Sequence, residues 1–179
     1  MVFATSIIKQ IKLNFMAEIT LKGNKINTSG SLPEKGSQVK DVELINTDLE
    51  RKKISGFNGK KLVFNIFPSV DTGVCAQSVR KFNESAGNKE NTLVLCISKD
   101  LPFAQKRFCA AEGLDNVLML SDFNSDFGDV YGCKIVDGPM QGLLSRAVIV
   151  TDENGKIVYN EQVKEITDEP NYDEALSHL

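Results

Sequence analysis

The sequence predicts an α/β sandwich, in which helices flank a mixed β-sheet. Three short apolar runs are nearly continuous, which is typical of strands that are buried on both faces. Segments with helical periodicity lie between these runs, and this alternation favours parallel strands joined by helices. Two further runs, separated by Asp-Glu-Asn-Gly, predict an antiparallel hairpin near the C-terminus. The parallel and antiparallel signals together predict one mixed sheet.

The strands follow from local signals, in chain order. The segment "EITLKGNKIN" predicts a short N-terminal β-hairpin, with Gly23-Asn24 as its turn. Two short strands are expected next, and the nearly continuous apolar runs come after them. The strands expected beyond the first hairpin span residues 39–48, 52–57, 61–67, 91–98 and 116–121, with the second hairpin at 144–160.

Helical spacing and capping residues predict three helices. The first has an apolar face, because four residues are spaced by four, three and four positions. These residues are Cys75, Val79, Phe82 and Ala86. Thr72 can cap the N-terminus of this helix through its hydroxyl. A second helix is expected over residues 101–113, where Pro102 suits the first turn and Gly113 the end. A short helix is expected over residues 170–179.

The domain organisation follows from length and from the N-terminal pattern. A chain of 179 residues is long enough for a sizeable core, and we expect a single domain over residues 16–179. The first 15 residues are mildly apolar but are interrupted by Lys9 and Lys12, and strand-like alternation starts at Met16. Residues 1–15 are therefore expected to be an extension outside the core.

Charge and hydropathy exclude several classes of protein. The net charge of -3 and the pI near 5.3 argue against a nucleic-acid-binding protein, which usually carries a concentrated basic face. No apolar run approaches the roughly 20 residues that a membrane-spanning helix needs. The N-terminus also lacks the pattern of a secretory signal. These observations predict a cytoplasmic protein that binds neither nucleic acid nor membrane.

The cysteine and histidine content limits the chemistry. Four cysteines are few for a disulfide-built scaffold of this length. They are Cys75, Cys96, Cys109 and Cys133. None belongs to a C-x-x-C pair of the kind that structural zinc sites usually contain, so no metal is expected. The one histidine, His178, is the penultimate residue, which excludes mechanisms that need a well-placed imidazole.

The stretch "FPSVDTGVCAQSVRKF" places Cys75 where a strand ends and a helix begins. Unpaired N–H groups and the positive end of the helix dipole favour a thiolate at such a position, and the thiolate is the reactive form of cysteine. Thr72 can place its hydroxyl near the sulfur, and Pro68 stiffens the loop beside it. The alternative is that Cys75 is only a small apolar residue on the buried face of the helix.

Three blocks of sequence point to a known family. The segment "PSVDTGVC" fits the pattern Pro-x-x-x-Thr-x-x-Cys and resembles the peroxidatic-cysteine motif of the peroxiredoxins. Together with "DLPFAQKRFC" and "GLLSRAVIV", it resembles the bacterial thiol peroxidases, an atypical two-cysteine branch of that family. The resemblance covers nearly all of residues 16–179. It implies a thioredoxin-like form of the predicted sandwich, a thiol-dependent peroxidase activity and no cofactor.

The resemblance also implies roles for five residues. Cys75 matches the peroxidatic cysteine of the family, and Cys109 matches the resolving cysteine. Thr72 and Pro68 match residues that shape the pocket around the sulfur. Arg146 matches an arginine that flanks the thiolate. For Arg146 the alternative is a surface charge at the end of a strand.

The implied reaction is the reduction of hydrogen peroxide and alkyl hydroperoxides. The Cys75 thiolate attacks the peroxide and becomes a sulfenic acid, which condenses with Cys109 to form an intramolecular disulfide. Thioredoxin is the implied reductant of that disulfide, and a homodimer is the implied assembly. A disulfide needs Cα atoms within roughly 7 Å, so we expect local unwinding around both cysteines if they lie farther apart when reduced.

Three other functions use a cysteine in such a position. A thiol-based redox sensor or relay would use the same cysteines, and the sequence leaves it open. A thioredoxin-like disulfide oxidoreductase is expected to carry a second cysteine three positions later, where this chain has Ser78. A cysteine phosphatase loop has five residues between cysteine and arginine, whereas four residues without a glycine separate Cys75 from Arg80.

The two remaining cysteines have weaker claims to a role in the chemistry. Cys96 lies in "LVLCIS", the pattern of a buried strand, which predicts a packing role. Cys133 follows Gly132 near an expected turn, which predicts partial exposure. No family function matches either residue.

Overall fold

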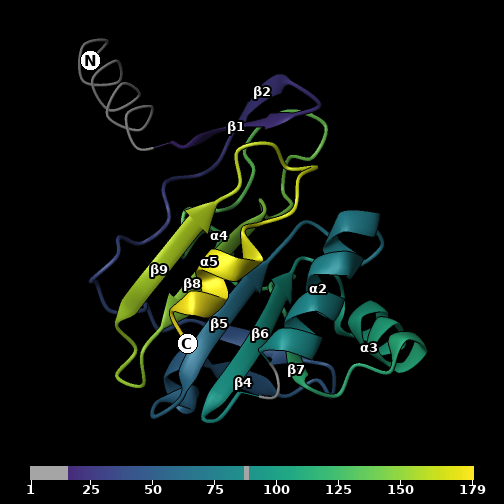
Figure 1. The fold of residues 1–179 in the computed structure, drawn as a ribbon. Coiled ribbons are helices and arrows are strands. Elements are labelled where there is room, and N and C mark those ends of the chain that lie inside the picture. Colours follow the sequence, from purple (N-terminus) through teal and green to yellow (C-terminus); the bar gives the residue numbers. More distant parts are fainter. Residues whose placement is uncertain (1–15, 87–88) are drawn as a thin grey trace.

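The computed structural model describes residues 16–86 and 89–179. The expected extension, residues 1–15, lies outside the described residues, so its separation from the core stays a prediction. A seven-stranded sheet forms the centre of the described part, with helices and a separate two-stranded hairpin around it (Figure 1). No helix in this part of the chain is long and apolar enough to span a membrane.

The bounds of the elements are as follows. In spatial order, the strands of the large sheet are β4 (Arg51–Lys53), β3 (Glu43–Asn46), β7 (Val117–Ser121), β6 (Thr92–Ser98), β5 (Lys61–Ile66), β8 (Ala147–Thr151) and β9 (Ile157–Gln162). The small hairpin consists of β1 (Glu18–Leu21) and β2 (Asn24–Asn27). The helices are η1 (Ile54–Phe57, a 3-10 helix), α2 (Gly73–Ser85), α3 (Pro102–Glu112), α4 (Phe127–Val130) and α5 (Tyr172–Ser177).

The large sheet is mixed, which confirms the prediction. Strands β5, β6 and β7 run parallel, and α2 and α3 connect them. Strand β8 pairs antiparallel with both β5 and β9, the latter through the predicted C-terminal hairpin. Strand β3 pairs antiparallel with β7 and β4 at the other side of the sheet.

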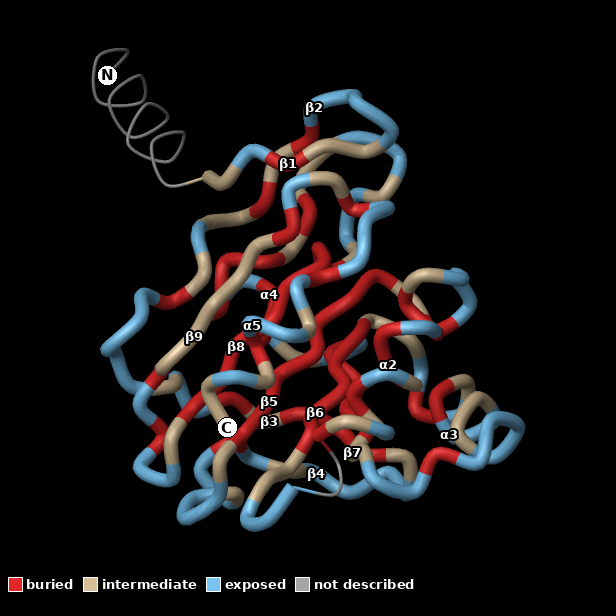
Figure 2. The backbone as a smooth tube through the Cα atoms, viewed as in Figure 1, coloured by how far each residue is buried: buried red, intermediate tan, exposed pale blue. Residues whose placement is uncertain are grey.

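Alternate residues of the central strands enter two apolar layers. Val63 of β5 faces α2 and α5 together with Val148 and Val150 of β8. Its neighbour Phe64 lies in the opposite layer, against residues of α4. All four side chains are 0 % exposed, and burial of a side chain of this size stabilises the fold by roughly 1.5–3 kcal/mol. Figure 2 shows these strands as the buried centre of the molecule.

Strand register brings three distant segments to one edge of the sheet. Ile66, at the end of β5, is paired with Ile97 of β6 and with Ala147 of β8. Because β5 and β6 are parallel and β8 is antiparallel to them, the loops after β5 and β6 meet the residue before β8. That residue is Arg146, and the loop after β5 leads to Cys75.

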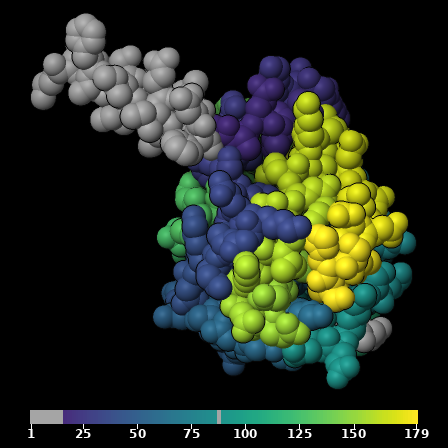
Figure 3. All heavy atoms as spheres, turned by 60° about the vertical axis from the view of Figure 1, so that its left-hand side comes forward, coloured from purple at the N-terminus to yellow at the C-terminus, as the bar shows by residue number. Residues whose placement is uncertain are grey.

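The N-terminal hairpin forms, but its turn lies one residue earlier than predicted. Leu21 is paired with Asn24, so the turn residues are Lys22 and Gly23. Both have positive φ angles, 51° and 79°. Their N–H groups each donate to the carboxylate of Glu165 at 3.0 Å. This carboxylate fixes the turn, and Figure 3 shows the purple hairpin packed beside the yellow-green segment that follows β9.

Two predicted strands are shorter than expected. Strand β3 occupies only the middle of residues 39–48, and the strand expected over residues 52–57 ends early. There β4 ends and η1 begins at Ile54, whose side chain is buried in the core and only 1 % exposed. Ser55 donates its N–H to the carboxylate of Asp41 at 2.9 Å, which bends the chain away from the sheet. The short helix α4 was not predicted.

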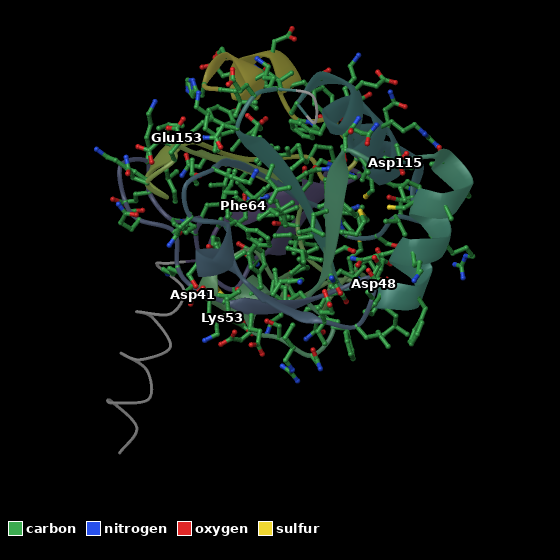
Figure 4. The ribbon with its side chains drawn as sticks, turned by 90° about the horizontal axis from the view of Figure 1, so that it is seen from below. Asp41, Asp48, Lys53, Phe64, Asp115 and Glu153 are labelled. Carbon is green, nitrogen blue, oxygen red and sulfur yellow. The ribbon has the colours of Figure 1, made fainter. Side chains whose placement is uncertain are left out.

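Helix α3 lies at the outer edge of the molecule. Figure 4 views the structure from below and shows α3 at the edge, with the labelled Phe64 in the interior. Within α3 the buried residues are Pro102 and Gln105. The helix ends at Gly113, as the sequence predicted, and this glycine has a φ of 63° in the left-handed conformation. It is therefore capped at its C-terminus but shallowly buried.

Candidate active site

Cys75 is the third residue of α2 and is 0 % exposed. Its Sγ lies 2.7 Å from Oγ1 of Thr72 and 3.4 Å from Nη2 of Arg146, and both groups are donors. Donors of this kind suit a sulfur that carries negative charge, as do the free N–H groups of the first helical turn. Cys75 is buried, as the packing alternative requires. That alternative, however, does not account for a guanidinium group on the sulfur.

Thr72 occupies the N-cap position of α2 but does not cap the helix through its side chain. The hydroxyl lies 3.2 Å from the carbonyl oxygen of Ser69 and 2.7 Å from Sγ of Cys75. The prediction of a side-chain cap is therefore wrong. One hydroxyl proton can serve only one of these acceptors, so it turns to the sulfur when the sulfur is anionic.

Arg146, the residue before β8, is 2 % exposed. Its Nε donates to the carbonyl oxygen of Ile166 at 3.0 Å, which fixes the guanidinium plane and aims Nη2 at Cys75. Nη1 is buried and has no hydrogen-bond partner among the described residues. The alternative of a surface charge is therefore wrong. A buried donor without a partner costs free energy unless a ligand supplies an acceptor.

A cavity of about 210 Å³ opens beside these groups. Pro68, Thr72 and Arg146 line it, so the structure brings these three predicted site residues together around one space. Most of the other walls are apolar. They come from Leu21, Gly73, Val74, Met140, Ile166 and Thr167. Because Leu21 belongs to β1, the N-terminal hairpin forms one wall of the cavity.

Cys109 is half-buried on α3, and its side chain packs against the apolar layer that contains Cys75. Both cysteines are free. Burial, reinforced by the nearby Asp115, raises the pKa of the Cys109 thiol to about 11. In this conformation Cys109 is therefore a protonated thiol that is not bonded to Cys75.

Cys96 and Cys133 are both 0 % exposed. Burial raises the pKa of Cys96 to about 12, although Asn65 donates a hydrogen bond to its sulfur. The packing role predicted for Cys96 is confirmed. The partial exposure predicted for Cys133 is wrong, because the chain folds back after α4 and places this residue in the apolar layer with Phe127 and Tyr131. Burial also raises the pKa of Cys133.

Ser78 stands where a C-x-x-C enzyme would have its second cysteine. Its hydroxyl donates to the carbonyl oxygen of Cys75 at 2.8 Å and accepts a hydrogen bond from Nδ2 of Asn65 at 3.2 Å. Ser78 is 0 % exposed, so it supports α2 from inside. Within residues 16–86 and 89–179, no cluster of His, Cys, Asp or Glu side chains is arranged to hold a metal ion.

Several contributors to the site carry no recognisable signal in the sequence. Ile166 orients Arg146 through a backbone carbonyl, which has no side-chain signal in a sequence. Leu21 and Met140 line the cavity as apolar residues, and in a sequence such residues look like members of the core. Only the packing of distant segments assigns these residues to the site.

Comparison with known proteins places the chain in a family. Residues 34–176 match the Redoxin family model. A thiol peroxidase of Corynebacterium glutamicum is 56% identical over 164 residues, which cover 92% of this chain and 99% of that protein. A thiol peroxidase of Mycobacterium bovis is 54% identical over 164 residues, which also cover 92% of this chain and 99% of that protein. The crystal structure of a peroxiredoxin-like protein from Aquifex aeolicus has a TM-score of 0.86 and 39% identity, and covers 92% of this chain and 96% of that chain.

The mixed sheet, its flanking helices and the N-terminal hairpin form the thioredoxin-like fold of the peroxiredoxins, and Cys75 lies in the first turn of α2 on that fold. The thiol peroxidase relatives show that the chain is a thiol-dependent peroxidase enzyme. The resemblance in the three sequence blocks is thereby confirmed. The chain belongs to the Redoxin family and, within it, to the thiol peroxidases.

Proposed function

We propose that the chain reduces hydrogen peroxide and alkyl hydroperoxides through a sulfenic acid at Cys75. The observation that carries this proposal is the pair of donors on the Cys75 sulfur, Thr72 and Arg146, beside a cavity. A peroxide oxygen in that cavity would supply the acceptor that Nη1 of Arg146 lacks among the described residues. The mostly apolar walls suit an alkyl chain on the second oxygen.

The first step is an attack by the Cys75 thiolate on one peroxide oxygen. An S–O bond forms as the O–O bond breaks, so the sulfur is oxidised to a sulfenic acid. The other oxygen leaves as alkoxide or hydroxide and takes a proton from solvent. Arg146 and Thr72 donate to the oxygens on which negative charge develops, and Pro68 closes one side of the pocket.

In the second step the Cys109 sulfur attacks the Cys75 sulfur, a disulfide forms and the sulfenic oxygen leaves as water. The described conformation opposes this step, because Cys109 is half-buried and its pKa is raised to about 11. Opening of α3 and of the first turn of α2 is therefore part of the proposal. Structures of the reduced and oxidised protein that superimpose in both regions would contradict it.

Turnover needs an external dithiol, and we propose thioredoxin. A thioredoxin thiolate would attack the disulfide by exchange and return both cysteines to thiols. We place this cycle in the cytoplasm, where protein thiols are kept reduced.

We also propose a homodimer. The supporting observation is that two apolar residues near the start of α3, Leu101 and Phe103, are 51% and 64% exposed. Light scattering tests this assembly. We expect a dimer for the unsubstituted protein and a monomer for Phe103→Glu, and a monomeric unsubstituted protein would contradict the proposal.

Intact mass and a non-reducing peptide map, recorded after one equivalent of peroxide, test the cycle. We expect the loss of two hydrogens and a crosslink between Cys75 and Cys109. The matched control, Cys96→Ser, removes a buried cysteine outside the proposed cycle and should form the same crosslink. Oxygen added to Cys75 without a crosslink would remove Cys109 as the resolving residue. No rapid change at Cys75 would overturn the peroxidase mechanism.

A further inference from the structure

One carboxylate lies between the two segments that carry Cys75 and Cys109. Asp100 follows β6, and the parallel register of β5 and β6 places it beside the loop that leads to Cys75. Its carboxylate accepts three hydrogen bonds. They come from Oγ of Ser69 at 2.7 Å, the N–H of Val70 at 2.8 Å and Oγ of Ser98 at 2.7 Å.

Two of these bonds fix the loop on which Thr72 depends. The carbonyl oxygen of Ser69 accepts the N–H of Thr72 at 3.3 Å and lies 3.2 Å from the Thr72 hydroxyl, whose single proton can turn to this carbonyl or to the sulfur. The same hydroxyl reaches the Cys75 sulfur. The position of Ser69 therefore determines where the Thr72 hydroxyl stands. Asp100 acts on Cys75 through these residues and does not touch it.

The third bond leads to the helix of Cys109. Oγ of Ser98 accepts a hydrogen bond from Nε2 of Gln105 at 3.1 Å, and this nitrogen also donates to the carbonyl oxygen of Leu120 at 3.1 Å. Gln105 is 0 % exposed, and its Oε1 accepts no hydrogen bond among the described residues. Gln105 lies one helical turn before Cys109. Polar contacts thus hold α3 at this point, and they can break without exposing a large apolar surface.

We propose that Asp100 is a positioning residue for both half-reactions. Through Ser69 it holds Thr72 against the Cys75 sulfur, which favours attack on peroxide. Through Ser98 it holds α3 closed, which opposes resolution. The inference rests on the proposed cycle. Removing the carboxylate should slow the oxidation of Cys75 and accelerate disulfide formation, because the first step needs an ordered loop and the second needs an open helix.

Asp100→Asn tests the proposal, since it keeps the size of the side chain but removes its charge and one acceptor. The protein is mixed rapidly with peroxide, quenched with acid at successive times and alkylated at its free thiols. The intact masses of these samples give two rate constants. One is the second-order oxidation of Cys75, and the other is the first-order formation of the disulfide. We expect the first to fall about tenfold and the second to rise about threefold. The matched control is Asp126→Asn, an exposed aspartate whose side chain makes no hydrogen bond in the described structure.

Two further variants separate the two sides of the Asp100 network. These are its bonds to the loop before α2 (the loop arm) and its bond through Ser98 to α3 (the helix arm). The variants also keep the proposal testable if Asp100→Asn does not fold. Ser69→Ala weakens only the loop arm, so it should slow oxidation and leave disulfide formation unchanged. Gln105→Ala weakens only the helix arm, so it should accelerate disulfide formation and leave oxidation unchanged. A merely structural role for Asp100 would not move the two rate constants in opposite directions.

The outcomes are distinct. Rate constants that both fall, or that both equal those of Asp126→Asn, would overturn the role of Asp100. If Asp100→Asn does not fold, variants of Ser69 and Gln105 that leave both rate constants unchanged would overturn it as well. An unsubstituted protein that is oxidised at Cys75 but forms no disulfide with Cys109 would instead overturn the proposed resolution step.

Discussion

The two cysteine regions are built in different ways. Cys75 is 0 % exposed, and its sulfur is contacted by Thr72, from the loop before α2, and by Arg146, the residue before β8. Cys109 is half-buried on an edge helix with two buried residues. The difference suits the proposed order of the steps, because directed bonds fix the sulfur that attacks first. The sulfur that is proposed to act second lies on a helix in which only Pro102 and Gln105 are buried.

Substituting Cys75 or Cys109 should give the largest effects. Equal effects of the two substitutions would show that the two cysteines do not have different roles. We expect Cys75→Ser to lower the rate of peroxide reduction by about a thousandfold or more, because a serine hydroxyl is a far weaker nucleophile. Cys109→Ser should still consume one equivalent of peroxide and accumulate sulfenic acid. Stopped-flow peroxide consumption and dimedone trapping measure these outcomes. Equal loss of the first step in both variants would contradict the assigned roles.

Thr72→Val tests whether the hydroxyl on the sulfur matters. Valine keeps the shape of the side chain but cannot donate, and a hydrogen bond to a charged group is worth about 1.5–3 kcal/mol. The second-order rate constant of Cys75 oxidation should therefore fall by about tenfold to a hundredfold. Thr72→Ser should restore most of it. A rate constant for Thr72→Val equal to that of the unsubstituted protein would show that Arg146 is sufficient.

Loosening α3 should act on the second cysteine alone. Gly113 ends α3 with a φ of 63°, and a Cβ at this position would meet no atom within 4 Å. Gly113→Ala therefore adds only backbone strain, roughly 1–2 kcal/mol. We expect faster disulfide formation and unchanged oxidation of Cys75, measured by the same quench method. Gly59→Ala is the matched control, since Gly59 has a φ of 91° and equally open surroundings outside α3.

The smallest effect concerns pH and the hairpin wall of the cavity. Hydrogen bonds from the N–H of Gly23 and the hydroxyl of Thr20 lower the pKa of Glu165 from 4.5 to about 2. A lowered pKa in the folded state stabilises the fold above pH 4.5, and this contribution is lost as pH falls towards about 2. The protection factors of the turn amides in hydrogen exchange, which correct for the intrinsic pH dependence of exchange, should fall over that range. Glu165→Gln should reduce this pH dependence, whereas Glu34→Gln, at an exposed position, should not.

Local signals predicted the strand and helix order and the place of Cys75. Nearly continuous apolar runs identified β5 and β6, and the spacing from Cys75 to Phe82 identified the buried face of α2. These features depend on residues that are close in sequence. The roles of Cys75, Cys109 and Arg146 came from a family resemblance and stay proposals.

The features that were mispredicted depend on distant contacts. The hairpin turn is fixed by Glu165, which lies 143 residues after Lys22. Cys133 is buried because the chain after α4 returns to the core. An aspartate after a strand, such as Asp100, looks like an ordinary loop residue until strand register places it beside another loop.

The distance between Cys75 and Arg146 along the chain has a consequence for synthesis. The two residues are 71 positions apart, and Arg146 reaches the sulfur only when β8 pairs with β5. A growing chain therefore carries Cys75 well before it carries the guanidinium group that contacts it. In the proposed mechanism, the contribution of Arg146 to the reactivity of Cys75 therefore begins only when β8 pairs with β5.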